Sequence, residues 1–244
     1  MRELRDFTMA RVGLGRAGNS MATRDLLDFQ LAHARARDAV HGCFDASALA
    51  AEIEAVGLQT MIVASAAHSR EEYLRRPDLG RSLDQRSRER LSQSIAGPFD
   101  VVFLIADGLS PLAVHTQAAP LLHTANNRLD PGEWRIAPVV IATQGRVALG
   151  DEIGEIAKAA LSVTLIGERP GLSSFDSMGA YLTWSPKRGR TDAERNCISN
   201  IRPEGLSIGA AAELLLLLMR EARTWRLSGV ALKPKTAGRL TPST

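Results

Sequence analysis

Cysteine is scarce in this sequence, with only Cys43 and Cys197 among 244 residues. Two cysteines cannot form a disulfide framework or a four-cysteine zinc cluster, and their scarcity fits a reducing compartment. Aromatic residues make up only 5% of the chain, and four lysines stand against twenty-six arginines. Because arginine carries a planar, permanently charged guanidinium, this bias fits either a surface rich in ion pairs and interfaces or genomic base composition alone.

Long apolar runs are also missing. None exceeds the six residues of 214–219, far fewer than the ~20 that a membrane span requires. Residues 1–8 carry several charges with no apolar segment behind them, so no secretory signal is expected. With 45% hydrophobic residues, 23% charged residues and a net charge of +3, the chain has a globular composition, and its charge does not indicate nucleic acid. We therefore expect a cytoplasmic protein that binds neither membrane nor nucleic acid.

Up to about residue 96 the sequence has the pattern of helices. Between residues 23 and 40, Leu26, Leu27, Leu31 and Ala34 recur mostly three or four residues apart, which predicts an amphipathic helix with this face buried. Further helices are expected at 47–56, at 70–75 with Ser69 as its N-cap, and at 79–95, and a strand is possible at 58–64.

After Gly97 and Pro98 the pattern changes to apolar, β-branched runs that alternate with helical segments, which is typical of buried parallel strands with crossover helices. Strands are expected at 100–105, 137–143, 162–166 and 180–184, and helices at 110–127, 152–160 and 208–225. The sequence thus predicts an α/β fold with a mostly parallel, Rossmann-like sheet domain at 97–227. A smaller, mainly helical region at 1–96 precedes it, and a flexible tail at 228–244 follows it.

Three of the predicted strands end in a glycine-containing loop with a charged residue, at 107–110, 145–147 and 167–172. Open parallel sheets bind ligands at the carboxyl ends of their strands, so we expect these loops to meet at one edge. In the third loop, glycines permit close backbone approach, while Glu168 and Arg169 place opposite charges at its mouth. Ordinary turns remain the alternative explanation for each loop.

Motifs for a self-contained catalytic site are missing. The sequence has neither a G-x-G-x-x-G nor a P-loop motif, no G-x-S-x-G elbow, and no histidines at metal-ligand spacing. Ser110 is expected to be a helix N-cap, and residues 192–200 a polar segment in which Cys197 is a small buried side chain. These residues favour a binding subunit. A stand-alone α/β nucleotide-binding protein or enzyme that uses the same loops, and an arginine-rich nucleic-acid binder, remain alternatives.

Eight segments, taken together and in order, resemble the small subunit of ethanolamine ammonia-lyase over residues 10–227. They are Ala10-Arg11-Val12, Gly15-Arg16-Ala17-Gly18, Arg76-Pro77-Asp78-Leu79-Gly80-Arg81, Ala106-Asp107-Gly108-Leu109-Ser110, Gly145-Arg146-Val147, Asp151-Glu152-Ile153-Gly154-Glu155-Ile156, Gly167-Glu168-Arg169-Pro170-Gly171-Leu172 and Cys197-Ile198-Ser199-Asn200-Ile201. Each segment alone is a weak signal, but all eight in this order are specific.

The resemblance implies a subunit of an adenosylcobalamin-dependent lyase that converts ethanolamine to acetaldehyde and ammonia. In that family the small subunit covers the cobalamin on a large, barrel-containing subunit, which holds the substrate and performs the radical chemistry. Carried over by motif, the cobalamin contacts fall at Val147, Glu168 and Cys197, with no catalytic residue and no metal ligand on this chain. The implied partners are the large subunit and further copies of both subunits in a hetero-oligomer.

Some features bear on the details of this resemblance. The sequence has no D-x-H-x-x-G motif, with which some cobalamin proteins replace the lower axial base, and this agrees with the base-on binding that the resemblance implies. Ala106 stands where the family commonly has serine, so a hydroxyl has no role there. The chain begins almost at the first motif, without the longer N-terminal extension of some relatives, so targeting to a bacterial microcompartment could differ.

Overall fold

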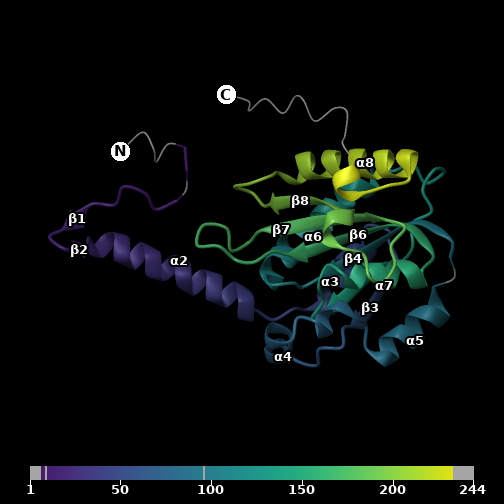
Figure 1. Ribbon diagram of the computed structural model, residues 1–244, viewed down its shortest axis with the longest axis horizontal. Coiled ribbons are helices and arrows are strands. Elements are labelled where there is room, and N and C mark those ends of the chain that lie inside the picture. Colours follow the sequence, from purple (N-terminus) through teal and green to yellow (C-terminus); the bar gives the residue numbers. More distant parts are fainter. Residues whose placement is uncertain (1–6, 9, 96, 233–244) are drawn as a thin grey trace.

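The computed structural model describes residues 7–8, 10–95 and 97–232 and shows an α/β architecture (Figure 1). In this part of the chain six strands form the main sheet, in the order β3-β5-β4-β6-β7-β8. The strands are β3 (Thr60–Ala64), β4 (Phe99–Ala106), β5 (Val139–Thr143), β6 (Ala159–Gly167), β7 (Met178–Trp184) and β8 (Arg195–Ile201). The first four in sheet order are parallel, whereas β7 and β8 each run antiparallel to the preceding strand. The predicted mostly parallel α/β sheet is therefore confirmed, and the sheet is mixed at one edge.

Helices cover both faces of this sheet. They are α2 (Thr23–His41), α3 (Ala46–Glu54), α4 (Arg70–Arg75), α5 (Gln85–Ser94), α6 (Pro111–Asn126), α7 (Leu149–Ile156) and α8 (Ile208–Trp225), with the short 3-10 helices η1 (Leu79–Arg81), η2 (Asp192–Glu194) and η3 (Gly229–Ala231). Helices α3, α6 and α8 pack on one face, and α5 and α7 on the other. A two-residue hairpin, β1 (Arg16–Ala17) with β2 (Ser20–Met21), precedes α2.

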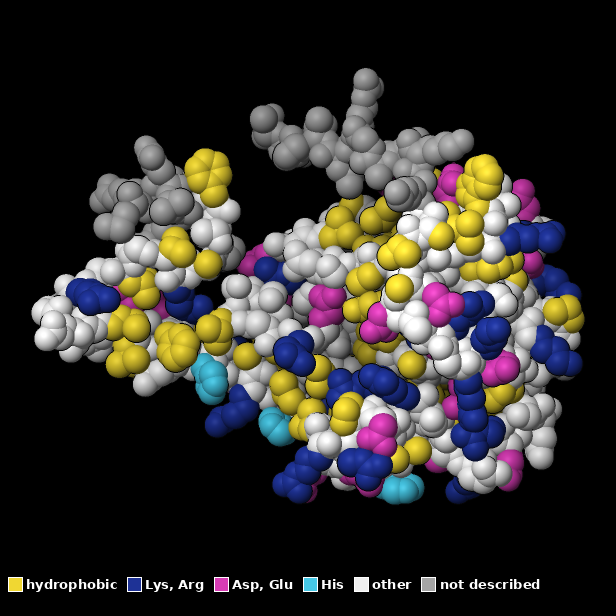
Figure 2. Space-filling view, viewed as in Figure 1, with side chains coloured by type: hydrophobic (Ala, Val, Ile, Leu, Met, Phe, Trp, Pro, Cys, Tyr) yellow, Lys and Arg dark blue, Asp and Glu magenta, His cyan; other side chains and the backbone are white. Residues whose placement is uncertain are grey.

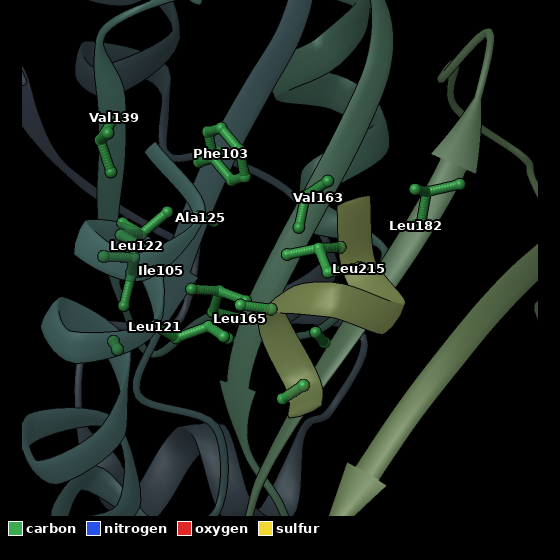
Figure 3. Close-up of a cluster of buried hydrophobic side chains, with 14 of the residues drawn as sticks. Phe103, Ile105, Leu121, Leu122, Ala125, Val139, Val163, Leu165, Leu182 and Leu215 are labelled. Atoms are coloured by element: carbon green, nitrogen blue, oxygen red, sulfur yellow. The ribbon is translucent and has the colours of Figure 1, made fainter. Parts of the chain in front are cut away.

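The core follows from strands that are apolar on both faces. Along β4, Phe103 and Ile105 point to the α6/α8 side, while Val102 and Leu104 belong to the cluster on the α5/α7 side. Figure 3 shows the first of these clusters, in which Leu215 of α8 lies against the strands. Because successive side chains of a strand point to opposite faces, a central strand covered by helices on both sides must be apolar throughout.

Two adjacent carboxylates on α7 fix the surrounding elements. Asp151 forms two hydrogen bonds with the guanidinium of Arg195 on β8, at 2.6 and 2.7 Å, and both side chains are buried. Glu152 accepts from Arg88 of α5 at 2.7 Å and from Arg188 in the β7–β8 connection. A buried charge is tolerated when it is paired and hydrogen bonded, so these pairs join both the edge strand and α5 to α7.

Two predicted helices have different bounds in the structure. The helix expected at 79–95 is divided into η1 and α5, because the backbone of residues 82–84 pairs with residues 64–66 and Leu83 is buried. Asp84 then caps α5 by accepting from the amide of Ser87. The helix expected at 152–160 begins at Leu149 and ends at Ile156, since Lys158 has a positive φ of 49° that stops the helix.

Residues 192–200 were interpreted only as a polar segment, and edge strand β8, which covers most of this region, was not predicted. Ile198 and Ile201 are both buried although they are three residues apart. A register shift opposite 178–180 of β7 makes this spacing possible. The shift breaks the two-residue alternation that marks a strand in sequence, which explains why the pattern did not reveal it. Cys197, expected to be buried, is exposed on this strand.

The prediction that the leucine face of α2 is buried is also wrong. Leu26, Leu27 and Leu31 are 41%, 57% and 52% exposed, and the buried residues of this helix are Ala32 and Ala39. The N-terminal half of α2 projects from the α/β body (Figure 1). The described residues therefore leave this apolar face uncovered.

The ends of the predicted domains lie within packed structure. Strand β3 precedes the predicted boundary at residue 97 yet pairs with β5, which follows it. At the start of the predicted tail, Gly229 donates its amide to Asn196 Oδ1 at 2.7 Å, and Leu232 is buried. Residues 233–244, the remainder of that predicted tail, lie outside the described residues.

Replacing Asp151 with asparagine is expected to lower the free energy of unfolding by about 3–5 kcal/mol, because it removes the buried, two-bond carboxylate partner of the Arg195 charge. Asp192 supplies the matched control, since its exposed carboxylate meets the same arginine at 3.5 Å. Asp192→Asn should change the free energy by less than about 0.5 kcal/mol. Urea unfolding measures both. Equal effects of the two substitutions would contradict the structural role of the buried pair.

Candidate functional site

The loops at the carboxyl ends of β4, β5 and β6 meet at one edge of the sheet, as predicted. Asp107, which follows β4, accepts the amide of Gly145 after β5 at 3.0 Å. The amide of Leu109 donates to the carbonyl of Gly167, the last residue of β6, at 2.9 Å. The three loops are thus connected by hydrogen bonds through residues that the sequence placed at strand ends.

Two glycines make this close approach possible. A Cβ on Gly108 would lie 2.3 Å from the carbonyl oxygen of Gly167, and one on Gly167 would lie 2.2 Å from that of Ser110. Gly108 also has a positive φ of 57°, which side chains disfavour. Ser110 caps α6 as predicted, and its hydroxyl also donates to the carbonyl of Phe175 at 2.8 Å.

Asp107 connects the loops at the carboxyl ends of the strands. Its carboxylate is buried, accepts the amides of Gly108 and Gly145 through Oδ1, and meets the guanidinium of Arg70 at 3.3 Å through Oδ2. Burial raises the pKa of Asp107 to about 6, against the opposing effects of Arg70 and of the neighbouring backbone amides. Arg70 also donates to the carbonyls of Gly108 at 2.7 Å and of Val40 at 2.8 Å. This carboxylate therefore orders strand ends, α4 and the end of α2 together.

Tyr73, a buried residue of α4, contacts two arginines and lines one side of the site. The guanidinium carbons of Arg146 and Arg70 lie 4.1 and 4.9 Å from the ring centroid of Tyr73. The Tyr73 hydroxyl donates to the carbonyl of Gly145 at 3.1 Å. Cation–π contacts of this kind hold planar guanidinium groups over a ring. They place Arg146, and with it the neighbouring Val147, at the edge of the sheet.

Only one of the two carboxylate oxygens of Glu168 accepts hydrogen bonds from the described residues. Its Oε2 accepts from the Ser177 hydroxyl at 2.5 Å and from the Asn200 amide at 3.1 Å. Its Oε1 lies beside Gly179, where a Cβ would come within 3.0 Å of it. Within the described chain Oε1 accepts no hydrogen bond, and Glu168 forms no ion pair with Arg169 or Arg146. One carboxylate oxygen is therefore oriented by the fold and the other is left available as an acceptor.

Cys197 lies within β8, two strands beyond β6 in the sheet. It is the cross-strand neighbour of Tyr181 on β7, so the two side chains share a face of the sheet. Although Cys197 is exposed as a residue, partial desolvation of its thiol raises the pKa of Cys197, and the hydrogen bond with the Tyr181 hydroxyl opposes this effect. The cysteine therefore stays a neutral thiol at neutral pH, suited to contact rather than to nucleophilic attack.

These groups surround a cleft of about 400 Å³. It is lined by Tyr73, Gly108, Leu109, Arg146, Val147, Ile166, Gly167, Glu168, Arg169 and Tyr181. Two of the predicted contact residues, Val147 and Glu168, thus share one cleft, and Cys197 adjoins it through Tyr181. The polar and apolar lining, with no dense positive charge, suits a neutral ligand that carries amide or hydroxyl groups.

Tyr73, Tyr181 and the structural role of Asp107 were not predicted. Tyr73 lies in a short charged helix and Tyr181 in a strand, and neither position carries a sequence signal that distinguishes it from a core residue. Only the packing of α4 and β7 around the strand ends brings them to the cleft. Asp107 was singled out as part of a loop, but its burial depends on elements far apart in sequence.

The fold and the cleft define an α/β protein with a candidate ligand-binding site at the carboxyl ends of its parallel strands. Among the described residues no group of three potential metal-ligating side chains occurs, and no helix there has the length and apolarity to cross a membrane. The cleft offers hydrogen-bonding groups and apolar walls but no pairing of a nucleophile with a base.

Comparison with known proteins gives the family. The sequence profile described as "Ethanolamine ammonia-lyase light chain" matches residues 1–233. The ethanolamine ammonia-lyase small subunit of Pseudomonas fluorescens is 54% identical over 234 residues, which cover 95% of this chain and 85% of that protein. The one from Rhodopseudomonas palustris is 56% identical over 234 residues, which cover 96% and 89%. This chain belongs to the ethanolamine ammonia-lyase light chain family and is a subunit of a lyase, as the resemblance predicted.

The raised pKa of Asp107 predicts a pH dependence of stability. Because the folded state holds this proton up to about pH 6, whereas a free aspartate has a pKa of 3.8, the contribution is fully present below about pH 4. It is lost as the pH rises through 6. The free energy of unfolding of the wild type, relative to Asp107→Asn, should fall by about 2.5 kcal/mol between pH 4 and pH 7. Urea titrations at both pH values measure this difference, and a rise instead of a fall would contradict the prediction.

Proposed function

We propose that this chain is the small subunit of an adenosylcobalamin-dependent ethanolamine ammonia-lyase, and that its cleft covers the cobalamin at the interface with the large subunit. The observation that carries this proposal is the carboxylate of Glu168, whose Oε2 is held by Ser177 and Asn200 while its Oε1 accepts no hydrogen bond in the part of the chain that the structure describes, in a cleft that Val147 also lines. Membership of the light chain family supports it. The enzyme would act in the cytoplasm as a hetero-oligomer with several copies of each subunit.

The residues of the cleft fit one side of a corrin cofactor. The rim of the corrin carries neutral amides, which need acceptors and donors rather than a cluster of charge. Glu168 supplies a carboxylate acceptor, the Nε of Arg146 is buried without a hydrogen-bond partner among the described residues, and Val147 supplies an apolar side chain. A cleft of about 400 Å³ is in the size range of a site for a drug-sized molecule, so it would take only part of the cofactor and leave the rest to the partner.

Three positions of this chain would hold the cofactor. Glu168 would accept a hydrogen bond from an amide or hydroxyl, Val147 would contribute backbone and apolar contact, and Cys197 would contact it from β8 as a neutral thiol. When bound, adenosylcobalamin supplies the radical chemistry that converts ethanolamine to acetaldehyde and ammonia. The contribution of this chain would be to position the cofactor and exclude water, with the substrate-handling residues on the large subunit.

Reconstitution tests the function as a whole. Alone, the small subunit should retain adenosylcobalamin poorly, because an interface cofactor loses much of its contact without the partner. Addition of the large subunit should restore both cofactor retention and ammonia release from ethanolamine. Gel filtration with absorbance detection of the corrin, and an ammonia assay, measure these results. A large subunit whose turnover does not change when this chain is added would remove the proposal.

Glu168→Gln tests the site. The glutamine can keep its oxygen toward Ser177 and Asn200, but it then presents an NH2 group where Oε1 now lies. Loss of a charge-assisted hydrogen bond should weaken cobalamin binding by the assembled enzyme by about ten- to a hundred-fold. The matched control is Glu213→Gln on α8, whose carboxylate is exposed and paired with Arg128 at 3.3 Å.

Titration of cobalamin into both complexes, together with thermal unfolding without cofactor, separates the alternatives. The control should bind as tightly as the wild type, and Glu168→Gln should change the midpoint of unfolding only slightly. Unchanged cobalamin affinity with a lowered midpoint would assign Glu168 a structural role only.

A further inference from the structure

The N-terminal half of α2 is an arm that the described residues leave bare. The hairpin β1–β2 and the first turns of α2 extend away from the α/β body (Figure 1). Within 21–31 of this arm, five large apolar side chains are between 39% and 57% exposed. They are Met21, Leu26, Leu27, Phe29 and Leu31.

These side chains do not form a single stripe. At 100° per residue, Leu27 and Leu31 lie on one side of the helix, and Leu26 and Phe29 on another. Figure 2 shows hydrophobic side chains gathered on this projecting part of the molecule. A helix with apolar side chains on more than one side is expected to be enclosed by other structure, and exposed apolar patches of this kind mark interaction sites.

We propose that the α2 arm, defined by these five apolar side chains, is a docking surface for the large subunit. The inference rests on the proposed function, since it takes the large subunit as the partner that covers the cleft. It adds a second contact region, distant from the cobalamin contacts, that uses apolar burial rather than the cofactor to join the subunits.

The arm is continuous with the edge that carries the cleft. The carbonyl of Val40, near the end of α2, accepts from Arg70 Nε at 2.8 Å, and Arg70 also binds the carbonyl of Gly108 in the cleft. Further along α2, the guanidinium of Arg35 lies 6.0 Å from the ring centroid of Phe175, in the loop whose Ser177 orients Glu168. A partner seated over the cleft is therefore placed to extend along the arm.

The same geometry disfavours a second copy of this chain as the occupant. Two copies that paired arm to arm would cover the leucines but would leave the cleft open. One large partner satisfies both surfaces, because both begin at the same edge of the sheet. Self-association through the arm is accordingly an outcome that the experiment must detect.

The test compares Leu27→Gln/Leu31→Gln with Val230→Gln, in the full chain, for binding to the purified large subunit. Val230 is 76% exposed on η3. The amide of the adjacent Gly229 donates to Asn196 near the start of β8, whereas the cleft lies at the carboxyl ends of the parallel strands. Binding is measured by titration against the immobilised large subunit. Analytical ultracentrifugation measures the oligomeric state of each small subunit alone, and thermal unfolding checks that each variant is folded.

The double variant should bind the large subunit about ten-fold or more weakly, as expected when buried interface side chains are truncated. Val230→Gln should bind like the wild type, and both variants should unfold near the wild-type temperature because the replaced side chains are exposed. The inference is overturned if the double variant binds the large subunit as tightly as the wild type does. It is also overturned if the wild-type small subunit alone is a dimer and the double variant is a monomer that still binds the large subunit. If the wild type itself neither binds the large subunit nor supports ammonia release, the proposed function fails, and the inference fails with it.

Discussion

The buried carboxylate of Asp107 is the constraint on which the candidate site depends. It joins the loop after β4 to the loop after β5 through the amides of Gly108 and Gly145, and through Arg70 it reaches α4 and the end of α2. A carboxylate without these partners would be costly to bury, and the loops without the carboxylate would leave backbone amides unpaired. The carboxylate and the loops therefore depend on each other, and together they fix the loops that border the cleft.

Further charged groups of the chain lie on either side of Asp107 and complete the site. On one side Tyr73 lies between Arg70 and Arg146 and keeps the loop before Val147 in place. On the other side Ser177 and Asn200 fix one oxygen of Glu168 and leave the other without a hydrogen bond among the described residues. Ordering these groups in advance lowers the entropic cost of holding a ligand. The proposed role of positioning a cofactor would need this kind of rigidity more than it would need a reactive group.

The strand-end loops could be predicted because their chemistry is local. The central strands are predominantly apolar and β-branched, and each ends near a glycine and a charged residue, so both the strands and the common edge at which they end follow from the sequence. Strand β8 could not be found in this way, because its register shift spaces Ile198 and Ile201 three residues apart. The leucines of α2 were recognised as an apolar face, but periodicity only indicates that a face is buried. It does not indicate whether the residues that bury the face belong to the same chain or to a partner.

The sequence by itself determined the fold class, the central strands, several helix caps and the family, since each depends on neighbouring residues or on a series of short motifs in order. Tertiary structure alone decided the order of the strands in the sheet, and it placed Tyr73 and Tyr181 at the cleft beside Val147 and Glu168. It also decided that Cys197 is exposed, that Asp107 is buried with a raised pKa, and that the arm is uncovered. The physical reason is that burial and long-range pairing depend on how elements distant in sequence pack together, and local patterns do not contain that information.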